Sequence, residues 1–250
     1  MSPPAYDFSG KVVLVTGAAG GLGRAIAGAF ARCGAEVVLV GRTARTLEEA
    51  AAGIRQQGGK AWALTCDVTD DAAVERIPQA VPRCDVLVNN AGTNVPQPFM
   101  SVDVATLDRL LALNVRSVFR VSQCLAAGMI ERGGGVIIHM SSQRGHVGAP
   151  RRTVYCMTKH AIEGLTKAMA LELAPHGIRV VSIAPTYILT PLTEPFFEDA
   201  AFRREVTGAI ALGRLGEPDE VAAAVLFAAS PQASLLTGTS LVVDGGYTAA

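Results

Sequence analysis

The sequence predicts an α/β protein built on one doubly wound parallel sheet of about seven strands. Short apolar runs rich in valine, isoleucine and leucine alternate along the chain with helical stretches. The runs are continuous, which is typical of strands that helices cover on both faces. Such alternation favours parallel strands joined by right-handed crossovers. No linker, repeat or low-complexity tract divides the 250 residues, so we expect a single domain over residues 1–250.

The predicted elements follow one another from the N-terminus with few interruptions. The apolar runs place strands at Val12–Thr16, Val37–Val40, Ala61–Leu64, Val86–Val88, Val136–Met140, Arg179–Ala184 and Ser240–Val243. Helical patterns fill the intervals at Leu22–Cys33, Arg45–Gln57, Ala72–Ala80, Ala105–Arg132, Val154–Ala174 and Pro218–Ala229. The interval before the fourth strand is short and contains Pro78 and Pro82, which predicts a clipped helix there.

The segment from Thr186 to about Leu212 interrupts this rhythm. It follows the sixth strand, has no run of strand type, and contains several prolines and phenylalanines. Ligands of open α/β sheets bind outside the carboxyl ends of the strands, and long irregular segments there are often functional. We therefore expect residues 186–212 to form a lid. The alternative is a helical hairpin that only packs against the domain.

The composition excludes several classes of protein. With 50% hydrophobic and 18% charged residues the chain is expected to be compact, and Lys+Arg and Asp+Glu balance at 22 each, so net charge does not steer it toward nucleic acid or acidic lipid. No stretch is long and apolar enough to span a membrane, and the opening MSPPAYDFSGK is not a secretory signal. The five cysteines are scattered without C-x-x-C spacing, which favours a reducing cytoplasm. We expect a cytoplasmic protein with a small-molecule partner, and neither nucleic acid nor membrane.

A glycine cluster joins the first strand to the first helix in Thr16-Gly17-Ala18-Ala19-Gly20-Gly21-Leu22-Gly23. Glycines let the backbone turn tightly and approach a pyrophosphate, and a helix N-terminus offers free N–H groups. By itself such a cluster can be only a tight turn. Its position in an alternating chain favours dinucleotide binding through Gly17, Gly21, Leu22 and Gly23.

The end of the second strand is expected to contact the adenosine ribose. NAD sites typically have an acid there, whereas this chain has Val40-Gly41-Arg42-Thr43. Arg42 can pair with a 2′-phosphate, for which Gly41 leaves room. The alternative is a solvated arginine that begins the next helix. The pattern favours NADP(H) over NAD(H), with Arg42 and Thr43 at the ribose.

Tyr155 and Lys159 are four residues apart, so one face of a helix carries both. A neighbouring ammonium favours the phenolate of a tyrosine, whose ordinary pKa is about 10. A phenol tuned toward neutrality can exchange a proton with a carbonyl or an alcohol. The spacing alone also occurs on ordinary surface helices. Ser142, after the fifth strand, can bring a second hydroxyl to the same oxygen, and its neighbour Ser141 competes for that role.

In combination these motifs resemble the short-chain dehydrogenase/reductase family, which has a Rossmann-like fold. The resemblance covers nearly the whole chain, and the details around Ser142 and Tyr155 are similar to those of sugar and dicarbonyl reductases. It depends on Thr16-Gly17…Gly21-Leu22-Gly23, Cys66-Asp67-Val68, Asn89-Asn90-Ala91-Gly92, Asn114, Ser141-Ser142, Tyr155…Lys159 and Pro185…Thr190. One departure is Pro185-Thr186, where the family usually has Pro-Gly.

The resemblance implies a role for each matched residue. Tyr155 is the general acid for carbonyl reduction and the base for alcohol oxidation, and Ser142 hydrogen-bonds the substrate oxygen. Lys159 binds the nicotinamide ribose and lowers the pKa of Tyr155, while Asn114 holds a water that continues the proton path. Further cofactor contacts are expected from Asp67 and Val68 at the adenine, from Asn89, Ala91 and Gly92 after the fourth strand, and from Pro185, Ile188 and Thr190 at the nicotinamide.

Polar and basic side chains near Ser142 are candidate substrate contacts, namely Gln143, Arg144, His146, Arg152 and Tyr187. They would suit a hydroxylated or anionic carbonyl compound such as a sugar or sugar acid. The alternatives are that Arg152 and its neighbour Arg151 face solvent or a subunit contact and that His146 is merely exposed. No group of His, Cys, Asp and Glu has metal-ligand spacing, so we expect chemistry without a metal.

These observations predict an NADP(H)-dependent oxidoreductase that interconverts a carbonyl and a secondary alcohol on a sugar, sugar acid or other small polar ketone. One alternative is a 3-oxoacyl thioester (acyl carrier protein) reductase, which would need a basic docking face. Another is a non-catalytic nucleotide-binding relative. The resemblance also implies a homotetramer, in which pairing would cover the edge strand near Ser240–Val243.

Overall fold

A parallel sheet forms the centre of the computed structural model, which describes residues 6–191 and 193–249. Residues 1–5 of the opening segment considered above, Leu192 in the predicted lid, and Ala250 lie outside that description. Within the described residues seven strands pair in the order β3-β2-β1-β4-β5-β6-β7. They are β1 (Val12–Thr16), β2 (Glu36–Gly41), β3 (Lys60–Thr65), β4 (Val86–Asn89), β5 (Gly135–Met140), β6 (Ile178–Pro185) and β7 (Thr239–Val243). The fold class is confirmed, and every predicted strand is correct to within one residue at each end.

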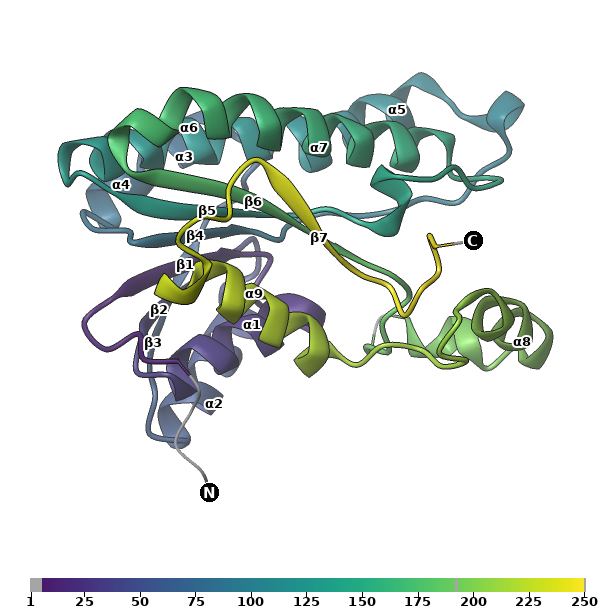
Figure 1. Cartoon of the computed structure of the whole chain (residues 1–250), viewed down its shortest axis with the longest axis horizontal. Coiled ribbons are helices and arrows are strands. Elements are labelled where there is room, and N and C mark those ends of the chain that lie inside the picture. The colour runs from purple at the N-terminus through teal and green to yellow at the C-terminus, as the bar shows by residue number, and fades with distance from the viewer. Residues whose placement is uncertain (1–5, 192, 250) are drawn as a thin grey trace.

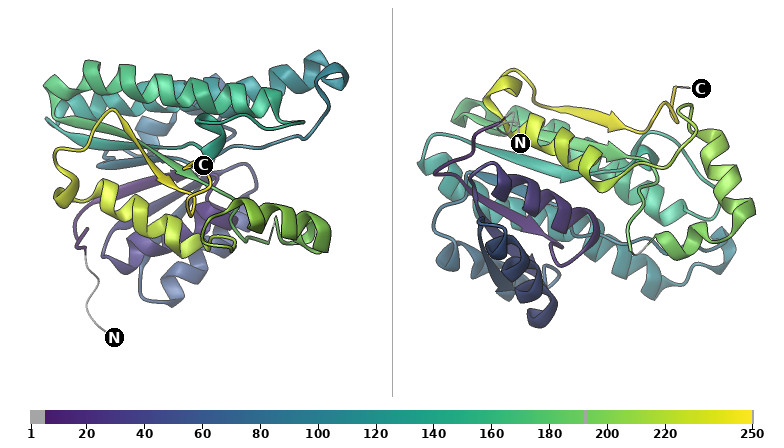
Figure 2. Two further views of the ribbon diagram at one scale, coloured as in Figure 1. Left: turned by 45° about the vertical axis from the view of Figure 1, so that its right-hand side comes forward. Right: turned by 90° about the horizontal axis from the view of Figure 1, so that it is seen from below.

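Helices cover both faces of the sheet (Figure 1). One face carries α1 (Gly21–Arg32), α2 (Ala44–Gln56) and α9 (Pro218–Ala229), which lie in front of the sheet in the right-hand view of Figure 2. The other face carries α3 (Asp71–Glu75), α4 (Ile77–Ala80), α5 (Val104–Leu111), α6 (Ser117–Glu131) and α7 (Thr153–Leu173). Successive strand residues point to opposite faces, so Val13 and Val15 join one hydrophobic cluster while Leu14 joins the other. Both faces are buried, which explains the unbroken apolar runs. No helix among the described residues is long and apolar enough to cross a membrane.

Two predicted helices are interrupted in the structure. The prediction for Ala72–Ala80 is corrected to α3 and α4, which meet at Arg76. Pro78 lies in the first turn of α4, where its missing N–H is tolerated, whereas inside a continuous helix it would remove a hydrogen bond. The prediction for Ala105–Arg132 is corrected to α5 and α6 joined by a π-helical turn, η2 (Ala112–Arg116). Such turns are frequent at functional sites, and this one contains Asn114.

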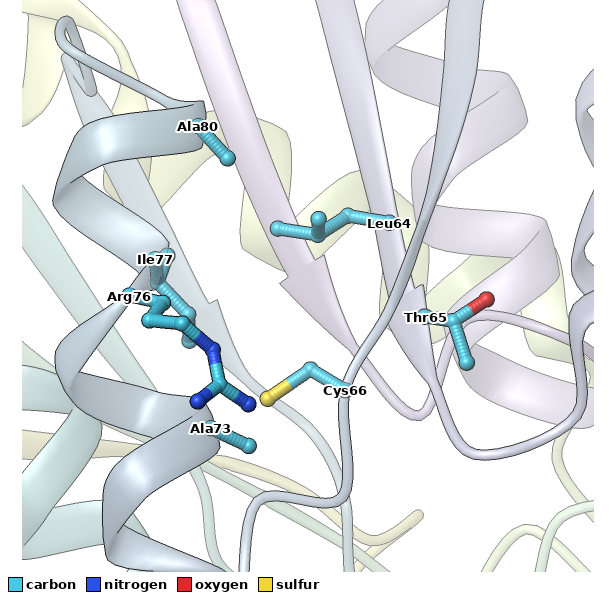
Figure 3. Close-up of a pocket in the computed structure, with 7 residues that line it drawn as sticks. All are labelled: Leu64, Thr65, Cys66, Ala73, Arg76, Ile77 and Ala80. Atoms are coloured by element: carbon cyan, nitrogen blue, oxygen red, sulfur yellow. The ribbon is translucent and has the colours of Figure 1, made fainter.

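A small cavity lies between β3 and the short helices α3 and α4 (Figure 3). Its volume is about 100 Å³, and its lining residues are Leu64, Thr65, Cys66, Ala73, Arg76, Ile77 and Ala80. Figure 3 shows the guanidinium of Arg76 pointing toward the thiol of Cys66. None of the predicted cofactor or substrate residues is among those seven, so the cavity is separate from the predicted site.

The predicted lid is more regular than its sequence suggested. Residues 186–212 lie beyond the carboxyl ends of β6 and β7, and α8 (Ala200–Ala209) projects there from the body of the molecule (Figures 1 and 2). A 3₁₀ turn, η5 (Glu194–Phe197), precedes α8. The segment has a hydrophobic cluster of its own, in which Phe197, Val206 and Ile210 are buried. Its position suits a lid, and that role stays a prediction.

Candidate active site

Ser142, Tyr155 and Lys159 meet at the carboxyl end of β5, as the sequence predicted. Ser142 is the second residue after the end of β5. Its hydroxyl accepts a hydrogen bond from the Arg144 N–H at 3.1 Å and bonds to Tyr155. Lys159 lies one turn below Tyr155 on α7, with its Nζ 5.6 Å from the centroid of the Tyr155 ring. The Lys159 ammonium donates to the Met140 carbonyl at 2.7 Å. Two hydroxyls and an ammonium therefore share one site.

The pKa of Tyr155 shifts in the direction opposite to our prediction. Burial raises the pKa of Tyr155 above its ordinary value, although part of the side chain stays exposed. The hydrogen bond from Ser142 is the main opposing influence, followed by the positive charges of Arg152 and Arg144. Lys159 is not among the groups that act on the pKa of Tyr155 here, and its ammonium donates to the Met140 carbonyl, so its expected influence on Tyr155 stays a prediction.

Lys159 is itself perturbed by its surroundings. The side chain is 7% exposed, and burial lowers the pKa of Lys159 to about 8 while the carboxylate of Glu163 opposes the shift. Glu163 lies one further turn along α7 and accepts a hydrogen bond from Ser182 at 2.7 Å. The Glu163 carboxylate on the same helix therefore offsets part of the cost of burying the Lys159 ammonium.

Asn114 is buried in the π-helical turn, and its amide is fully engaged with protein. Its Oδ1 accepts from the Thr93 N–H at 2.9 Å, and its Nδ2 donates to the Thr93 carbonyl at 2.8 Å and to Thr158 at 3.2 Å. A Cβ added at Gly92 would lie 3.3 Å from Asn114 Oδ1 and 3.8 Å from Lys159 Nζ. Asn114 thus ties the loop after β4 to α7 beside Lys159.

The glycine loop has the close approaches that a phosphate cradle needs. Gly17 and Gly21 have positive φ angles of 65° and 52°, which glycine adopts without strain. A Cβ at Gly17 would lie 2.9 Å from Ala91 Cα, and one at Gly23 would lie 2.3 Å from the Gly17 carbonyl oxygen. Leu22 lies between these contacts at the start of α1. The loop is packed against the end of β4, and its residues fit a dinucleotide.

The predicted adenosine contacts gather at the ends of β2 and β3. A hydrogen bond from the Thr69 N–H is the main influence that lowers the pKa of Asp67, and the charge of Arg42 also contributes. Val68 is buried, and Thr43 precedes α2 as its N-cap residue. A Cβ at Gly41 would lie 3.4 Å from Leu47, an ordinary van der Waals distance, so the room that we expect Gly41 to leave for a 2′-phosphate stays a prediction.

Asn89 faces the interior of the protein. Its side chain donates to Ser122 at 2.9 Å and lies 3.2 Å from His139 Nδ1. Burial lowers the pKa of His139 to about 3, so that ring is a neutral core group. Only the backbone of Asn89 is free to face a cofactor.

The predicted nicotinamide contacts lie in the loop after β6. Thr186 donates its N–H to Val243 at 3.1 Å, and it has no positive φ, so threonine takes the usual glycine position without strain. Pro185 ends β6, and Ile188 is buried and bridges to Gly216. Thr190 is buried and lies 3.8 Å from the position of a Cβ on Gly21. This loop therefore reaches across to the phosphate end.

The predicted substrate residues divide into two groups. Arg144, Tyr187 and Arg152 lie on the Tyr155 side, and Arg144 donates to the Tyr187 hydroxyl at 3.3 Å. Gln143 is buried, and its Oε1 has no partner among the described residues. His146 is placed elsewhere, since its ring lies 3.1 Å from Ser240 and 3.4 Å from Glu163. No group of three or more metal-ligating side chains is found in residues 6–191 and 193–249.

Known proteins are similar to this chain in sequence and in overall structure. A family model described as enoyl-(acyl carrier protein) reductase matches residues 17–248. A short-chain type dehydrogenase/reductase from Mycobacterium marinum, solved as a crystal structure, is 39% identical, with a TM-score of 0.91 and 98% of each chain covered. This chain belongs to the short-chain dehydrogenase/reductase family. L-xylulose reductase from Bos taurus is 39% identical over 97% of this chain and 98% of its own. The gluconate 5-dehydrogenase of Burkholderia cenocepacia, solved with NADP and tartrate, is 32% identical, with a TM-score of 0.94 over 100% of both chains.

Membership of the short-chain dehydrogenase/reductases confirms that the chain is an oxidoreductase. Several of its contacts were missed in the sequence. The Thr16 hydroxyl accepts from the N–H groups of Asn90 and Ala91 at 3.0 Å each, and Asn90 Nδ2 donates to the Thr16 carbonyl at 2.9 Å. Tyr247, near the C-terminus, accepts from Arg144 at 2.8 Å. Asn90 was visible as part of a motif, whereas no local signal marks Tyr247.

Replacing Gly23 with alanine tests whether the glycine loop binds the phosphates of the cofactor. The new methyl would collide with backbone at 2.3 Å, so we expect a loss of about 1–3 kcal/mol of stability and at least about tenfold weaker NADPH binding. Thermal unfolding and a fluorescence titration with NADPH measure these. Gly20→Ala is the control, because Gly20 has extended backbone and nothing lies within 4 Å of its Cβ position. Equal effects of the two changes would contradict the assignment.

Proposed function

We propose that the protein is an NADP(H)-dependent oxidoreductase that interconverts a carbonyl and a secondary alcohol on a sugar, sugar acid or other small polar ketone. The observation that carries the proposal is the convergence of the Ser142 and Tyr155 hydroxyls beside the Lys159 ammonium. The names of two relatives, an L-xylulose reductase and a gluconate 5-dehydrogenase solved with NADP, support this substrate class and cofactor.

The proposed roles follow from the negative charge that develops on the carbonyl oxygen during reduction. A bound NADPH supplies the hydride for the carbonyl carbon, and with one proton the carbonyl and NADPH become the alcohol and NADP⁺. Tyr155 donates its phenolic proton to the carbonyl oxygen, and Ser142 donates a hydrogen bond to the same oxygen. Because burial raises the pKa of Tyr155, the phenol is protonated at neutral pH, which suits reduction.

The other matched residues bind the cofactor or extend the proton path. Lys159 would hold the nicotinamide ribose hydroxyls, and Thr190 the carboxamide. The Asn114 amide is occupied by Thr93 and Thr158, so we place the relay water at the backbone of the π-helical turn. The remaining cofactor contacts would be Gly17, Gly21, Leu22, Gly23, Arg42, Thr43, Asp67, Val68, Asn89, Ala91, Gly92, Pro185 and Ile188.

Arg42→Ala tests the preference for NADP(H). Arg42 is exposed, and its charge lowers the pKa of Asp67, which locates it at the adenosine end. Loss of a charge-assisted contact to the 2′-phosphate should lower kcat/KM for NADPH about 10- to 100-fold and leave that for NADH nearly unchanged. Arg45→Ala is the control, since Arg45 is exposed and pairs with Glu49. A native enzyme that prefers NADH would contradict the proposal.

A substrate panel followed by NADPH oxidation tests the reaction. Ketoses, keto acids and small diketones are expected to be reduced well, and acetoacetyl thioesters poorly. Preference for the thioesters would favour the acyl carrier protein reductase instead. Failure of every carbonyl compound, with NADPH still bound, would favour a non-catalytic relative.

We further propose a cytoplasmic homotetramer whose subunits are single catalytic domains over residues 1–250 with a lid at 186–212. All five cysteines are free thiols, which suits a reducing compartment. Large apolar side chains are exposed on α6 and α7, including Phe119, Met157 and Leu171, and Val242 is exposed on the edge strand β7. Contact between subunits would cover them. A monomer in light scattering at micromolar concentration would contradict the tetramer.

A further inference from the structure

Two arginines near Tyr155 have no acid to balance them, one in the turn after Ser142 and one at the N-terminus of α7. Arg144 and Arg152 both contribute positive charge at Tyr155. The groups that act on these two side chains are the phenols of Tyr187, Tyr247 and Tyr155 and other arginines, and no carboxylate of the described residues is among them. The substrate end of the site is therefore cationic, although the chain as a whole has a net charge of zero.

Arg144 is fixed in place by its contacts. It is 9% exposed, donates to the Tyr247 hydroxyl at 2.8 Å and to the Gly148 carbonyl at 2.8 Å. Its guanidinium also lies 4.9 Å from the centroid of the Tyr247 ring, within the range of a cation–π contact. Three of its five N–H donors are used, since a third bond goes to the Tyr187 hydroxyl, so Arg144 supplies a charge that is fixed in position.

Arg152 differs from the other partly buried arginines of the chain. Arg120 pairs with Asp71 and Glu75, and Arg179 donates to main-chain carbonyls. Arg152 is also partly buried, yet its side chain makes no hydrogen bond or ion pair within the part of the chain that the structure describes. A partly desolvated guanidinium whose N–H donors have no protein acceptor gains from a ligand that supplies acceptors.

The backbone holds Arg152 at the site. It is the N-cap residue of α7, three residues before Tyr155. The preceding residue, Arg151, has a φ of 60°, a conformation that costs free energy for any residue except glycine. The Arg151 carbonyl accepts from the Gln97 N–H at 3.0 Å, which links this turn to the loop after β4. The strained turn therefore places Arg152 beside the proton donor.

We propose that the substrate carries a carboxylate and that Arg152 binds it, with Arg144 as the fixed charge behind. A guanidinium presents paired donors that match the two oxygens of a carboxylate. A hydroxylated keto acid could place its carbonyl oxygen at Ser142 and Tyr155 and its carboxylate at Arg152. This inference deepens the proposed function and depends on it for the reacting carbonyl, and Arg152 becomes a specificity-determining residue.

The test compares 5-keto-D-gluconate with L-sorbose, which has a hydroxymethyl group in place of the carboxylate. We expect the native enzyme to favour the keto acid by at least about tenfold in kcat/KM, and Arg152→Gln to reduce that preference about 10- to 100-fold, mainly through KM. Arg152→Lys should restore part of it. Arg151→Gln, which removes an exposed charge next to it, should leave the preference within about threefold.

A binding measurement separates this inference from the proposed function. Calorimetric titration with D-gluconate, without turnover, should show binding to the native protein and at least about tenfold weaker binding to Arg152→Gln. Reduction of L-sorbose and the keto acid with equal efficiency would overturn the inference and leave the proposed function standing. Binding of D-gluconate through Arg152 with no reduction of either compound would overturn the proposed function and leave Arg152 as a carboxylate-binding residue. Equal losses on both substrates in Arg152→Gln would show a structural role and overturn the inference.

Discussion

Tyr155→Phe is expected to lower kcat about 10²- to 10⁴-fold in both directions, the range for loss of a general acid–base. The substitution keeps the ring that packs on α7 and removes only the hydroxyl that bonds to Ser142. NADPH affinity and thermal stability should change little. Steady-state kinetics, a fluorescence titration and thermal unfolding measure the three quantities. Tyr6→Phe is the control, because Tyr6 is a partly buried tyrosine that packs on the hydrophobic cluster containing Val13.

The pH dependence of the reduction and oxidation rates is expected to identify Tyr155 as a titrating group. Since burial raises the pKa of Tyr155, the phenol stays protonated through neutral pH. Reduction uses the protonated form, so its rate should be level there and fall as pH rises through that pKa. Oxidation uses the phenolate, so its rate should increase with pH. The part of each dependence that Tyr155 causes should disappear in Tyr155→Phe, whereas the titration of Lys159, whose pKa is about 8, should remain. A variant that kept more than about a tenth of the native kcat would contradict the assignment.

Ser142→Ala is expected to lower kcat about 10²- to 10³-fold, the range for loss of one donor to a developing oxyanion. Ser142 bonds to Tyr155, so the change also removes the hydrogen bond that opposes the raised pKa of Tyr155. The alkaline limb of the reduction profile should therefore move to higher pH. Kinetics of the variant across pH measure both effects.

Ser141→Ala is the matched control for Ser142→Ala. Ser141 is the adjacent residue and is equally buried, but its Oγ has no hydrogen-bond partner among the described residues. Removing an unsatisfied buried hydroxyl should leave kcat unchanged and be neutral or stabilising. If Ser141→Ala were inactive and Ser142→Ala active, the roles of the two serines would be exchanged.

The sheet was predictable because its signal is local. A strand buried on both faces requires an apolar residue at every position, and the structure places each run accordingly. Helix interruptions were harder to predict. Pro78 indicated the break between α3 and α4, but nothing in the residues around Asn114 distinguishes a π-helical turn from ordinary helix. The partners of Asn114 in that turn, Thr93 and Thr158, are distant in sequence, so no local pattern records these contacts.

By itself the sequence determined the sheet, the glycine loop and the face that Tyr155 shares with Lys159, since these depend on periodicity and spacing along the chain. Only the tertiary structure decided what surrounds that face. It directed the Lys159 ammonium to the Met140 carbonyl, and it buried the Tyr155 phenol, which raises the pKa of that phenol. It also brought Tyr247 to Arg144, 103 residues away, and left Arg152 unpaired within the described residues. Desolvation and pairing depend on every element packed around a group, and no local pattern records them.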